Sequence, residues 1–405
     1  MSATDTKMGY QDLPDYRMVG RHDVFPHTTH DEIERFNYLA QMNRHLAARV
    51  LPHVKTIFDR RVAPRVVANG GRFDNRHDVR KALLSDPYYQ TWSALRRMTM
   101  EQRQQAGRWV AVRQAEELAA KVDRVLAEHP GGYEEDPTVK IPRYVSAVDH
   151  HCMPGSYHTE LFPGDVSAAA NYDSGIFATT GGALGLYSDG GGKALVRWVH
   201  RNLPGFEPKD ILDIGTTVGH NLLPVAAAYP RAQAVGVDVS RPVLRYALAR
   251  ARSLGVENVR FVQADGADLS RFADNSFDWV QTAMFLHELS YSSIRAIMRE
   301  SFRVLRPGGV VLHLEQPQYT KEMSLFEQAM RDWDAFYNNE PFWSTMHEID
   351  LDGFMIEAGF KGPDLIHGAV TAIVSGDALS DVAADKTEDY GRKARWHLIG
   401  ARKAA

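Results

Sequence analysis

The chain has 405 residues, of which 44% are hydrophobic and 24% are charged, and its formal net charge is −4. This composition is typical of a globular protein, and the length predicts more than one structural unit. The small net charge argues against a protein that binds nucleic acid over its whole surface. The single cysteine, Cys152, excludes an internal disulfide and fits a reducing cytoplasm. No stretch reaches the roughly 18 apolar residues that a membrane-spanning helix needs, so we expect a soluble cytoplasmic protein without a membrane anchor.

The first part of the chain predicts a helical unit. Residues 1–29 are mostly polar, and we expect a loosely ordered arm there. Residues 30–140 form the predicted all-helical N-terminal domain, because apolar residues recur at helical spacing. The clearest series are Ile33, Phe36, Leu39, Met42 and Leu46, then Trp109, Val112, Ala115, Leu118 and Val122. The glycine- and proline-rich stretch 130–137 breaks this pattern and places a boundary nearby.

One part of this helical region is strongly basic. Residues 44–113 contain fifteen lysines or arginines and only five acidic residues. Such a surface is able to contact a polyanion, but a run of this kind is more often a solvated helix face whose charges pair with acids elsewhere. Residues 141–195 follow; they are rich in glycine and aromatic residues without clear periodicity, and they predict a connector or lid.

From residue 196 to residue 405, predicted strands and helices alternate, which favours an α/β fold with a parallel sheet covered on both faces. The most informative segment is 210–220, where an apolar strand runs into a turn that contains Gly215 and Gly219. Such a turn brings the backbone close to a ligand. A dinucleotide-binding fingerprint would also need glycines at Thr217 and His220, so pyrophosphate binding is disfavoured.

Acidic residues follow three successive predicted strands: Asp213, Asp238 and Asp265. A fourth strand is predicted at 277–280, and a helix from 293 to 305 ends at the turn 307–309 before a fifth strand at 310–314. In this order the signals resemble the class I S-adenosylmethionine-dependent methyltransferases. That resemblance implies a Rossmann-like seven-stranded sheet whose last, antiparallel strand lies at 394–400.

The same resemblance implies S-adenosylmethionine as the cofactor and assigns its contacts. Asp238 would hold the ribose hydroxyls and Asp265 the adenine amine, while Tyr172 would help to cover the cofactor. Thr217 stands where the family usually has glycine, and its side chain must either touch the methionine end of the cofactor or turn away from it. The complete set of expected cofactor-binding residues is Asp213, Gly215, Thr217, Gly219, Asp238, Val239, Asp265, Gly266 and Tyr172.

The segment Phe285–Leu289 carries the expected catalytic groups, His287 and Glu288. It is similar to the Leu-His-Asp segment of small-molecule O-methyltransferases, in which the histidine removes the proton of the acceptor. An imidazole titrates near neutral pH and suits that role; the alternative is a structural histidine. The Asn/Asp-Pro-Pro-aromatic signature of enzymes that methylate base amines or glutamine amides is absent here, which favours a small acceptor.

Five further residues are candidates for the acceptor pocket: His313, Trp333, Tyr337, Asn338 and Tyr157. Aromatic rings would pack an apolar body, and Asn338, Asn339 or Glu340 would fix a polar end. For the aromatic segment 333–343, packing between structural units is an equally good interpretation. His313 faces either the cleft or a helix.

The grouping of His150, His151, Cys152 and His158 invites comparison with a zinc site. Their spacing matches no closed four-ligand site, and adjacent side chains point apart in an extended chain. The sequence therefore predicts no metal.

Together these features predict a methyltransferase that uses S-adenosylmethionine on a small organic acceptor, most readily at oxygen with His287 as general base. A small thiol or sulfide acceptor is an alternative, because it needs little base catalysis. A nucleic-acid or protein methyltransferase that uses residues 44–113 is a second alternative, although nucleic acid is the less favoured partner. A non-catalytic cofactor-binding interaction protein is the third. The helical unit would contribute to the acceptor pocket, to a homodimer contact, or to both.

Overall fold

A single mixed sheet organises the molecule, for which the computed structural model describes residues 14–374 and 395–405. The sheet has eight strands in the order β1-β4-β3-β2-β5-β6-β8-β7. Strands β1 to β6 are parallel, and β8 runs antiparallel to both β6 and β7. The strands are β1 (Tyr133–Glu134), β2 (Asp210–Ile214), β3 (Gln233–Asp238), β4 (Val259–Gln263), β5 (Phe277–Ala283), β6 (Leu305–Glu315), β7 (Leu365–Thr371) and β8 (Arg395–Arg402).

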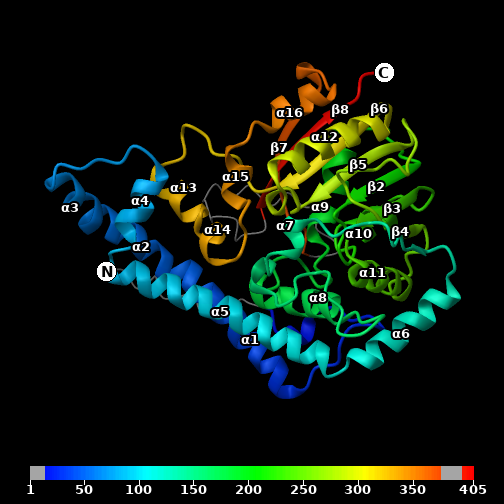
Figure 1. Cartoon of the computed structure of the whole chain (residues 1–405), viewed down its shortest axis with the longest axis horizontal. Coiled ribbons are helices and arrows are strands. Elements are labelled where there is room, and N and C mark those ends of the chain that lie inside the picture. The colour runs from blue at the N-terminus through cyan, green and yellow to red at the C-terminus, as the bar shows by residue number, and fades with distance from the viewer. Residues whose placement is uncertain (1–13, 375–394) are drawn as a thin grey trace.

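Helices cover both faces of the sheet (Figure 1). Helices α9, α10 and α11 pack on one face, and α12 and α16 pack on the other. Ile211, Leu212 and Ile214 of β2 have no exposed surface, as expected for a parallel strand that is buried on both sides. The helices on the faces of the sheet are α8 (Ser167–Thr180), α9 (Gly190–Asn202), α10 (Leu222–Ala228), α11 (Arg241–Ser253), α12 (Tyr291–Val304) and α16 (Leu351–Ala358).

The predicted α/β architecture, with its antiparallel strand near residue 394, is confirmed, but the sheet is wider than expected. The extra strand β1 lies in the stretch that the sequence assigned to the end of the helical domain. Tyr133 and Glu134 pair with Phe261 and Val262 of β4. This stretch therefore extends the edge of the sheet instead of only linking two units.

The N-terminal region is helical, as its periodicity predicts. Thr29 caps α1 and forms a capping box with Glu32, and Asp86 caps the long helix α5, which starts at Pro87. Short π-helical turns at 46–50 and 58–62 separate α1, α2 and α3. The remaining helices are α1 (His30–His45), α2 (Leu51–Ile57), α3 (Ala63–Ala68), α4 (Arg76–Leu83), α5 (Pro87–Val112), α6 (Ala115–Glu128), α7 (Arg143–Ser146), α13 (Leu325–Arg331), α14 (Trp333–Tyr337) and α15 (Trp343–Glu348).

These N-terminal helices share their core with a distant part of the chain. Trp92 of α5 packs in one cluster with Phe326 and Met330 of α13 and with Trp333 of α14. Figure 1 shows α2, α3, α4 and α13 grouped on the side of the molecule away from the sheet. The structure thus differs from the prediction of a helical domain limited to residues 30–140, because an apolar surface on α13 and α14 completes that core.

Two other predictions of loose structure differ from what is seen. Within the expected arm, residues 1–13 lie outside the described residues, whereas Tyr16 and Val24 are almost completely buried. Within the expected connector, α8 is a packed helix whose buried residues include Ala169, Ala170 and Phe177. In the described residues, no helix combines the length and the apolar character that crossing a membrane requires.

Candidate functional site

The turn after β2 lies where the strand order reverses, with β3 and β4 on one side and β5 on the other. In open parallel sheets, ligands bind at such a point, beyond the carboxyl ends of the strands. Gly215 and Gly219 adopt φ values of +74° and +79°, which favour glycine. A Cβ atom on Gly215 would lie 2.4 Å from the ring of Phe285. The turn is therefore closely packed from below by the loop that follows β5.

Thr217 adopts a left-handed conformation with φ +45°, which is unfavourable for a β-branched residue. Its backbone N–H donates to Asp238 Oδ2 at 3.1 Å, so the turn is tied to the end of β3. Its side chain lies toward the hydroxyl of Tyr172 on α8, where it opposes the rise that burial causes in the pKa of this tyrosine. Of the two orientations left open by the sequence, the structure shows the side chain turned toward this tyrosine.

Asp238 ends β3 and accepts two backbone hydrogen bonds. Besides Thr217, the N–H of Ser240 donates to its Oδ1 at 2.9 Å. Burial raises the pKa of Asp238 to about 6, although these backbone bonds oppose the shift. Ser240 stands at the start of α11, but its hydroxyl donates to the carbonyl of Tyr157 at 2.6 Å instead of capping the helix. This contact joins the segment around Tyr157 to the strand end.

The other two strand-end acids differ in their surroundings. Asp213 is buried beside Gln281, whose Nε2 donates to it at 3.2 Å, and burial raises its pKa to about 7. Asp265 follows β4 and accepts the backbone N–H of Ala267 at 2.9 Å. A Cβ atom on Gly266 would lie 2.4 Å from Ile214, so this glycine permits close packing of the turn on β2.

Val239, the residue after Asp238, links β3 to β4 through its backbone carbonyl. The carbonyl of Val239 accepts a hydrogen bond from Gln263 Nε2 at 3.0 Å, and Gln263 is the last residue of β4. Asp238, Val239, Asp265 and Gly266 are thus placed along one edge of the sheet, which is the edge that also bears the glycine turn.

Two tyrosines lie over this edge. The rings of Tyr157 and Tyr172 are 5.4 Å apart at a steep angle, and Tyr172 lies 5.5 Å from the ring of His220. The hydroxyl of Tyr157 donates to Glu288 Oε1 at 3.1 Å. The two predicted lid residues therefore join the glycine turn to the segment that carries the expected catalytic groups.

His287 is buried and held by a carboxylate. Its Nδ1 lies 2.7 Å from Glu315 Oε1, and its backbone N–H donates to Glu315 Oε2 at 3.3 Å. Burial alone would lower the pKa of His287, but the charge and hydrogen bond of Glu315 raise it to about 9. The edge of the Trp343 ring lies against the imidazole, with ring centroids 4.6 Å apart. At neutral pH this histidine is protonated, which suits a hydrogen-bond donor better than a resting base.

A second histidine, which the sequence considered only for zinc, lies beside the first. His151 Nε2 is 3.1 Å from Glu288 Oε1, and His151 Nδ1 is 2.5 Å from Glu340 Oε1. Burial would lower the pKa of His151, but the two carboxylates raise it to about 10. Asn338 Nδ2 donates to Glu340 Oε1 at 3.2 Å. Burial opposes ionisation of Glu288, but the hydrogen bond from His151 prevails and lowers its pKa to about 2.

The predicted acceptor residues divide into two groups. Tyr157 and Asn338 contact the carboxylates beside His151, whereas Trp333 and Tyr337 pack on the N-terminal helices. The indole N–H of Trp333 donates to Ser93 Oγ at 2.8 Å, so this ring is part of the helical core. For Trp333 and Tyr337 the structure therefore favours the packing interpretation.

His313 lies deeper in the sheet. It alternates along β6 with Leu312 and Leu314 and shares a strand face with Glu315. Its Nδ1 is hydrogen-bonded to Thr282 Oγ1 at 2.9 Å, and burial lowers its pKa to about 4. The imidazole is therefore neutral and sits beneath Glu315, on the side of the strand that carries the His287 contact.

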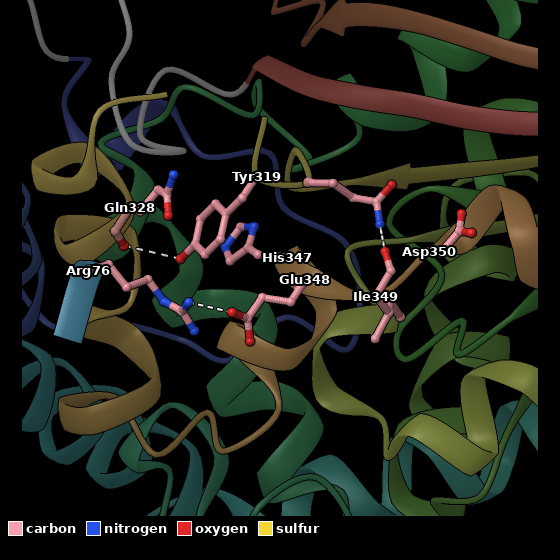
Figure 2. Close-up of a pocket in the computed structure, with 8 residues that line it drawn as sticks. Arg76, Tyr319, Gln328, His347, Glu348, Ile349 and Asp350 are labelled. Atoms are coloured by element: carbon pink, nitrogen blue, oxygen red, sulfur yellow. Dashed lines mark hydrogen bonds and ion pairs between the residues drawn. The ribbon is translucent and has the colours of Figure 1, made fainter. Parts of the chain in front are cut away.

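A separate cavity of about 450 Å³ opens between α4 and the segment 318–350. Figure 2 shows Tyr319 stacked on His347 and Arg76 directed toward Glu348. His347 lies 5.8 Å from Trp343, the ring that contacts His287. The cavity thus lies behind the wall of the His287 site and not at the glycine turn.

Two residues that shape this site, His151 and Glu315, were not among the acceptor residues expected from the sequence, whereas Glu340 was expected to fix a polar end of the acceptor. Glu315 is an acidic residue at the end of strand β6, which is the same pattern that identified Asp238 at the end of β3. His151 and Glu340 lie in irregular segments that are distant from each other in the sequence, and only the folded chain brings them together.

Comparison with known proteins agrees with this geometry. A family model described as "Methyltransferase domain" matches residues 211–309. Demethylmenaquinone methyltransferase of Porphyromonas gingivalis is 32% identical over 184 residues, which cover 45% of this chain and 69% of that protein. Its counterpart in Thermus thermophilus is 37% identical over 110 residues, or 27% and 48% of the two chains.

A third relative is named ubiquinone/menaquinone biosynthesis C-methyltransferase, from Rhizobium meliloti. It is 33% identical over 134 residues, which cover 33% of this chain and 50% of that protein. The chain thus spans about half of the length of two of these relatives and about two thirds of the third. Residues 211–309, which the family model matches, contain the glycine turn and the strand-end acids, and the chain belongs to the class I S-adenosylmethionine-dependent methyltransferases.

Proposed function

We propose that the chain transfers a methyl group from S-adenosylmethionine to a small organic acceptor. The observation that carries this proposal is the junction of Thr217 and Asp238 at the point where the strand order reverses. It combines a tight turn with a carboxylate whose oxygens retain lone pairs for the ribose hydroxyls. Tyr157 and Tyr172 connect this edge of the sheet to the segments that carry His287 and His151.

The cofactor contacts follow from this arrangement. Asp238 is assigned to the ribose and Asp265 to the adenine amine, and Val239 and Gly266 would border the base. Asp213 and the backbone of the glycine turn would face the methionine end. The proposed cofactor-binding set is Asp213, Gly215, Thr217, Gly219, Asp238, Val239, Asp265, Gly266 and Tyr172.

The cofactor supplies an electrophilic methyl group, and the transfer is an in-line displacement. The residues of this chain must therefore hold the acceptor atom in line and exclude water. Tyr157 and Tyr172 provide an aromatic cover, and burial of His287 removes competing solvent. Asn338 and Glu288 would contact polar groups of the acceptor.

Transfer to oxygen is the first candidate reaction, and its general base would be His287 after this residue has lost the proton that Glu315 stabilises. The contact of Nδ1 with Glu315 fixes the ring and leaves Nε2 as the nitrogen available to an acceptor hydroxyl. Transfer to carbon is the second candidate, and two observations favour it. The relatives from Rhizobium and Porphyromonas are named for methylation in quinone biosynthesis. A protonated His287 would also stabilise the enolate or phenolate oxygen of a carbon nucleophile by donating a hydrogen bond.

The experiment that separates these candidates compares wild-type protein with His287→Gln in single-turnover reactions. The product is assigned by mass spectrometry and NMR, which identify the methylated atom. If His287 is the base for an oxygen acceptor, the chemical step slows by a factor of about 100 or more, while affinity for the cofactor is retained. A variant of the exposed His367, His367→Gln, serves as the control.

Two results would refute parts of this proposal. An unchanged chemical step in His287→Gln would exclude the base role. Methylation of a thiol or sulfide at wild-type rate by the same variant would favour the sulfur acceptor instead, since such an acceptor needs little base.

A further inference from the structure

Three side chains from distant segments converge beside the proposed acceptor site. His151 comes from the turn 150–152, Glu288 from the loop after β5, and Glu340 from the segment after α14. One nitrogen of His151 and one oxygen of each carboxylate all lie within 4.8 Å of one another. Imidazole nitrogen and carboxylate oxygen are ordinary ligands of divalent transition metals.

Glu340 provides an independent observation. Its side chain has no exposed surface, and among the residues that the structure describes its Oε2 has no hydrogen-bond partner. This oxygen faces Nε2 of His287 at 3.9 Å, which is too long for a hydrogen bond. A buried carboxylate oxygen without a partner is costly, and coordination of a cation would satisfy it.

The negative charge of the cluster also favours a bound cation. Glu288, Glu315 and Glu340 lie close together, and their ion pairs in the described part of the chain are all with histidines. Even if both imidazoles carry a proton, three carboxylates facing two histidines leave one net negative charge in this largely buried site. A divalent cation in place of the proton of His151 would remove that imbalance.

The site is also accessible. The side chains of His151 and Glu288 are 28% and 18% exposed, whereas Glu340 is fully buried. An ion therefore has an entry path on one side and a buried ligand on the other. Three protein ligands are the number found in catalytic metal sites, where further positions stay free for water or substrate.

We propose that His151, Glu288 and Glu340 bind a divalent first-row transition metal, such as Mn²⁺ or Zn²⁺, whose open positions receive an oxygen of the acceptor. Metal binding itself follows from the three side chains alone. The role toward the acceptor rests on the proposed methyl transfer, and it narrows the substrate class to molecules that present an ionised or carbonyl oxygen next to the reacting atom. The cation would polarise that oxygen and lower the pKa of an attached hydroxyl.

Metal binding is tested with the full chain, purified without a histidine tag and treated with a chelator that is then removed. Mn²⁺ alone is titrated and followed by electron paramagnetic resonance and calorimetry, and Zn²⁺ is titrated by calorimetry. We expect one ion per chain, with affinity reduced about 100-fold or more in Glu340→Gln and in Glu288→Gln. His158→Gln, from the same segment as His151 but outside the triad, should bind as wild type.

A second readout identifies the ligand nitrogen. Wild-type protein should show magnetic coupling between Mn²⁺ and one imidazole nitrogen, and His151→Gln should lose it. Affinity for S-adenosylhomocysteine shows whether each variant remains folded. If the Glu340 or His151 variant does not fold, the test rests on Glu288→Gln, because Glu288 is less buried than Glu340.

The outcomes separate the two proposals. Absence of stoichiometric Mn²⁺ or Zn²⁺ binding, or equal binding by the triad variants and His158→Gln, would overturn the metal site, and His151 would then be an imidazolium shared by two carboxylates. Methyl transfer by a protein that binds no metal would refute this inference alone. Metal binding without any methyl transfer would refute the proposed function alone.

Discussion

Thr217 shows how one residue sets the shape of the cofactor turn. A threonine at φ +45° is strained, yet its amide ties the turn to Asp238 and its side chain contacts Tyr172. The sequence identified this position as a departure from the family pattern, but it did not indicate where the side chain points. That direction depends on α8, which the sequence did not predict.

The first prediction concerns that strain. Thr217→Gly should raise the free energy of unfolding by about 1 kcal/mol, because glycine adopts the left-handed region without the clash of a Cβ atom. Chemical denaturation measures the change, and calorimetry with S-adenosylhomocysteine should show unchanged affinity, because Thr217 is assigned to the cofactor through its backbone and not through its side chain. Thr217→Ala is the matched control: it removes the hydroxyl but retains the Cβ atom, and it should give no gain. Destabilisation by glycine would show that the contact with Tyr172 outweighs the strain.

The second prediction uses the pKa of Asp238. Because burial raises this pKa to about 6 and the ribose hydroxyls need the carboxylate form, the affinity for S-adenosylhomocysteine should be constant above about pH 6. Below it, affinity should fall by up to about tenfold per pH unit. Calorimetry across this range measures the profile, and Asp238→Asn should bind weakly and with less dependence on pH. A profile that is the same in both proteins would contradict the assignment.

At the scale of elements, Asp173 joins the N-terminal segment to the sheet. Its carboxylate accepts hydrogen bonds from His22 Nε2 at 2.8 Å, His220 Nε2 at 2.6 Å and the Tyr246 hydroxyl at 2.9 Å. Burial would raise the pKa of Asp173, but the nearby Arg250 charge and the histidine bonds hold it well below its usual value. Residues around His22, α8, the glycine turn and α11 thus meet at one buried charge.

The third prediction follows from this junction. Asp173→Asn should lower the free energy of unfolding by about 3–5 kcal/mol, because the charge of Arg250 loses its buried partner. The depressed pKa of Asp173 stabilises the wild type above about pH 4, and that contribution disappears as the pH falls through the folded-state value, so the two proteins should converge in acid. Urea denaturation at several pH values measures this. Asp23→Asn, an exposed change in the same segment, should be near neutral; an equal loss in both variants would refute the role of Asp173.

The elements that the sequence located are those with a strong local pattern. Strands β2 to β6 end in recognisable acids or turns, and α1 and α5 show helical spacing. Helix α8 was missed because buried residues occur around most of its circumference, including Ala170, Asn171 and Ser174, and no polar face gives it a period. Strand β1 has only two residues, and its pairing with β4 depends on tertiary structure.

At the scale of the whole molecule, acids from distant segments neutralise part of the charge of the basic region 44–113. Three of its arginines form ion pairs with acids outside the region, from α1, the junction of α13 and α14, α14 and α15. These pairs are Arg76 with Asp332 and Glu348, Arg96 with Asp334, and Arg113 with Glu32. The excess charge of 44–113 is therefore partly neutralised by residues that the linear sequence places far away.

The fourth prediction follows from this pairing. Fluorescence anisotropy with a labelled RNA should show no binding by the full chain at physiological salt. Tight binding that weakens steeply as salt is added would instead support a nucleic-acid substrate and contradict a small acceptor.

The cofactor edge was predictable because each of its acids follows a strand, whereas the acceptor side was only partly predictable. His287 and Glu288 follow β5 and were found. Glu340 was expected to fix a polar end of the acceptor, but its pairing with His151 joins two irregular segments that are far apart in the sequence. Long-range convergence of this kind leaves no spacing in the sequence.

The central claim is methyl transfer to a small molecule, and S-adenosylhomocysteine release tests it most directly. The full chain is incubated with S-adenosylmethionine and pools of small acceptors that carry enol, phenol or carbonyl oxygens, and both products are identified by mass spectrometry. We expect S-adenosylhomocysteine together with a small product that has gained one methyl group, and neither with Asp238→Asn. Cofactor binding without release from any pool, or a methyl group found only on RNA or protein, would contradict the account.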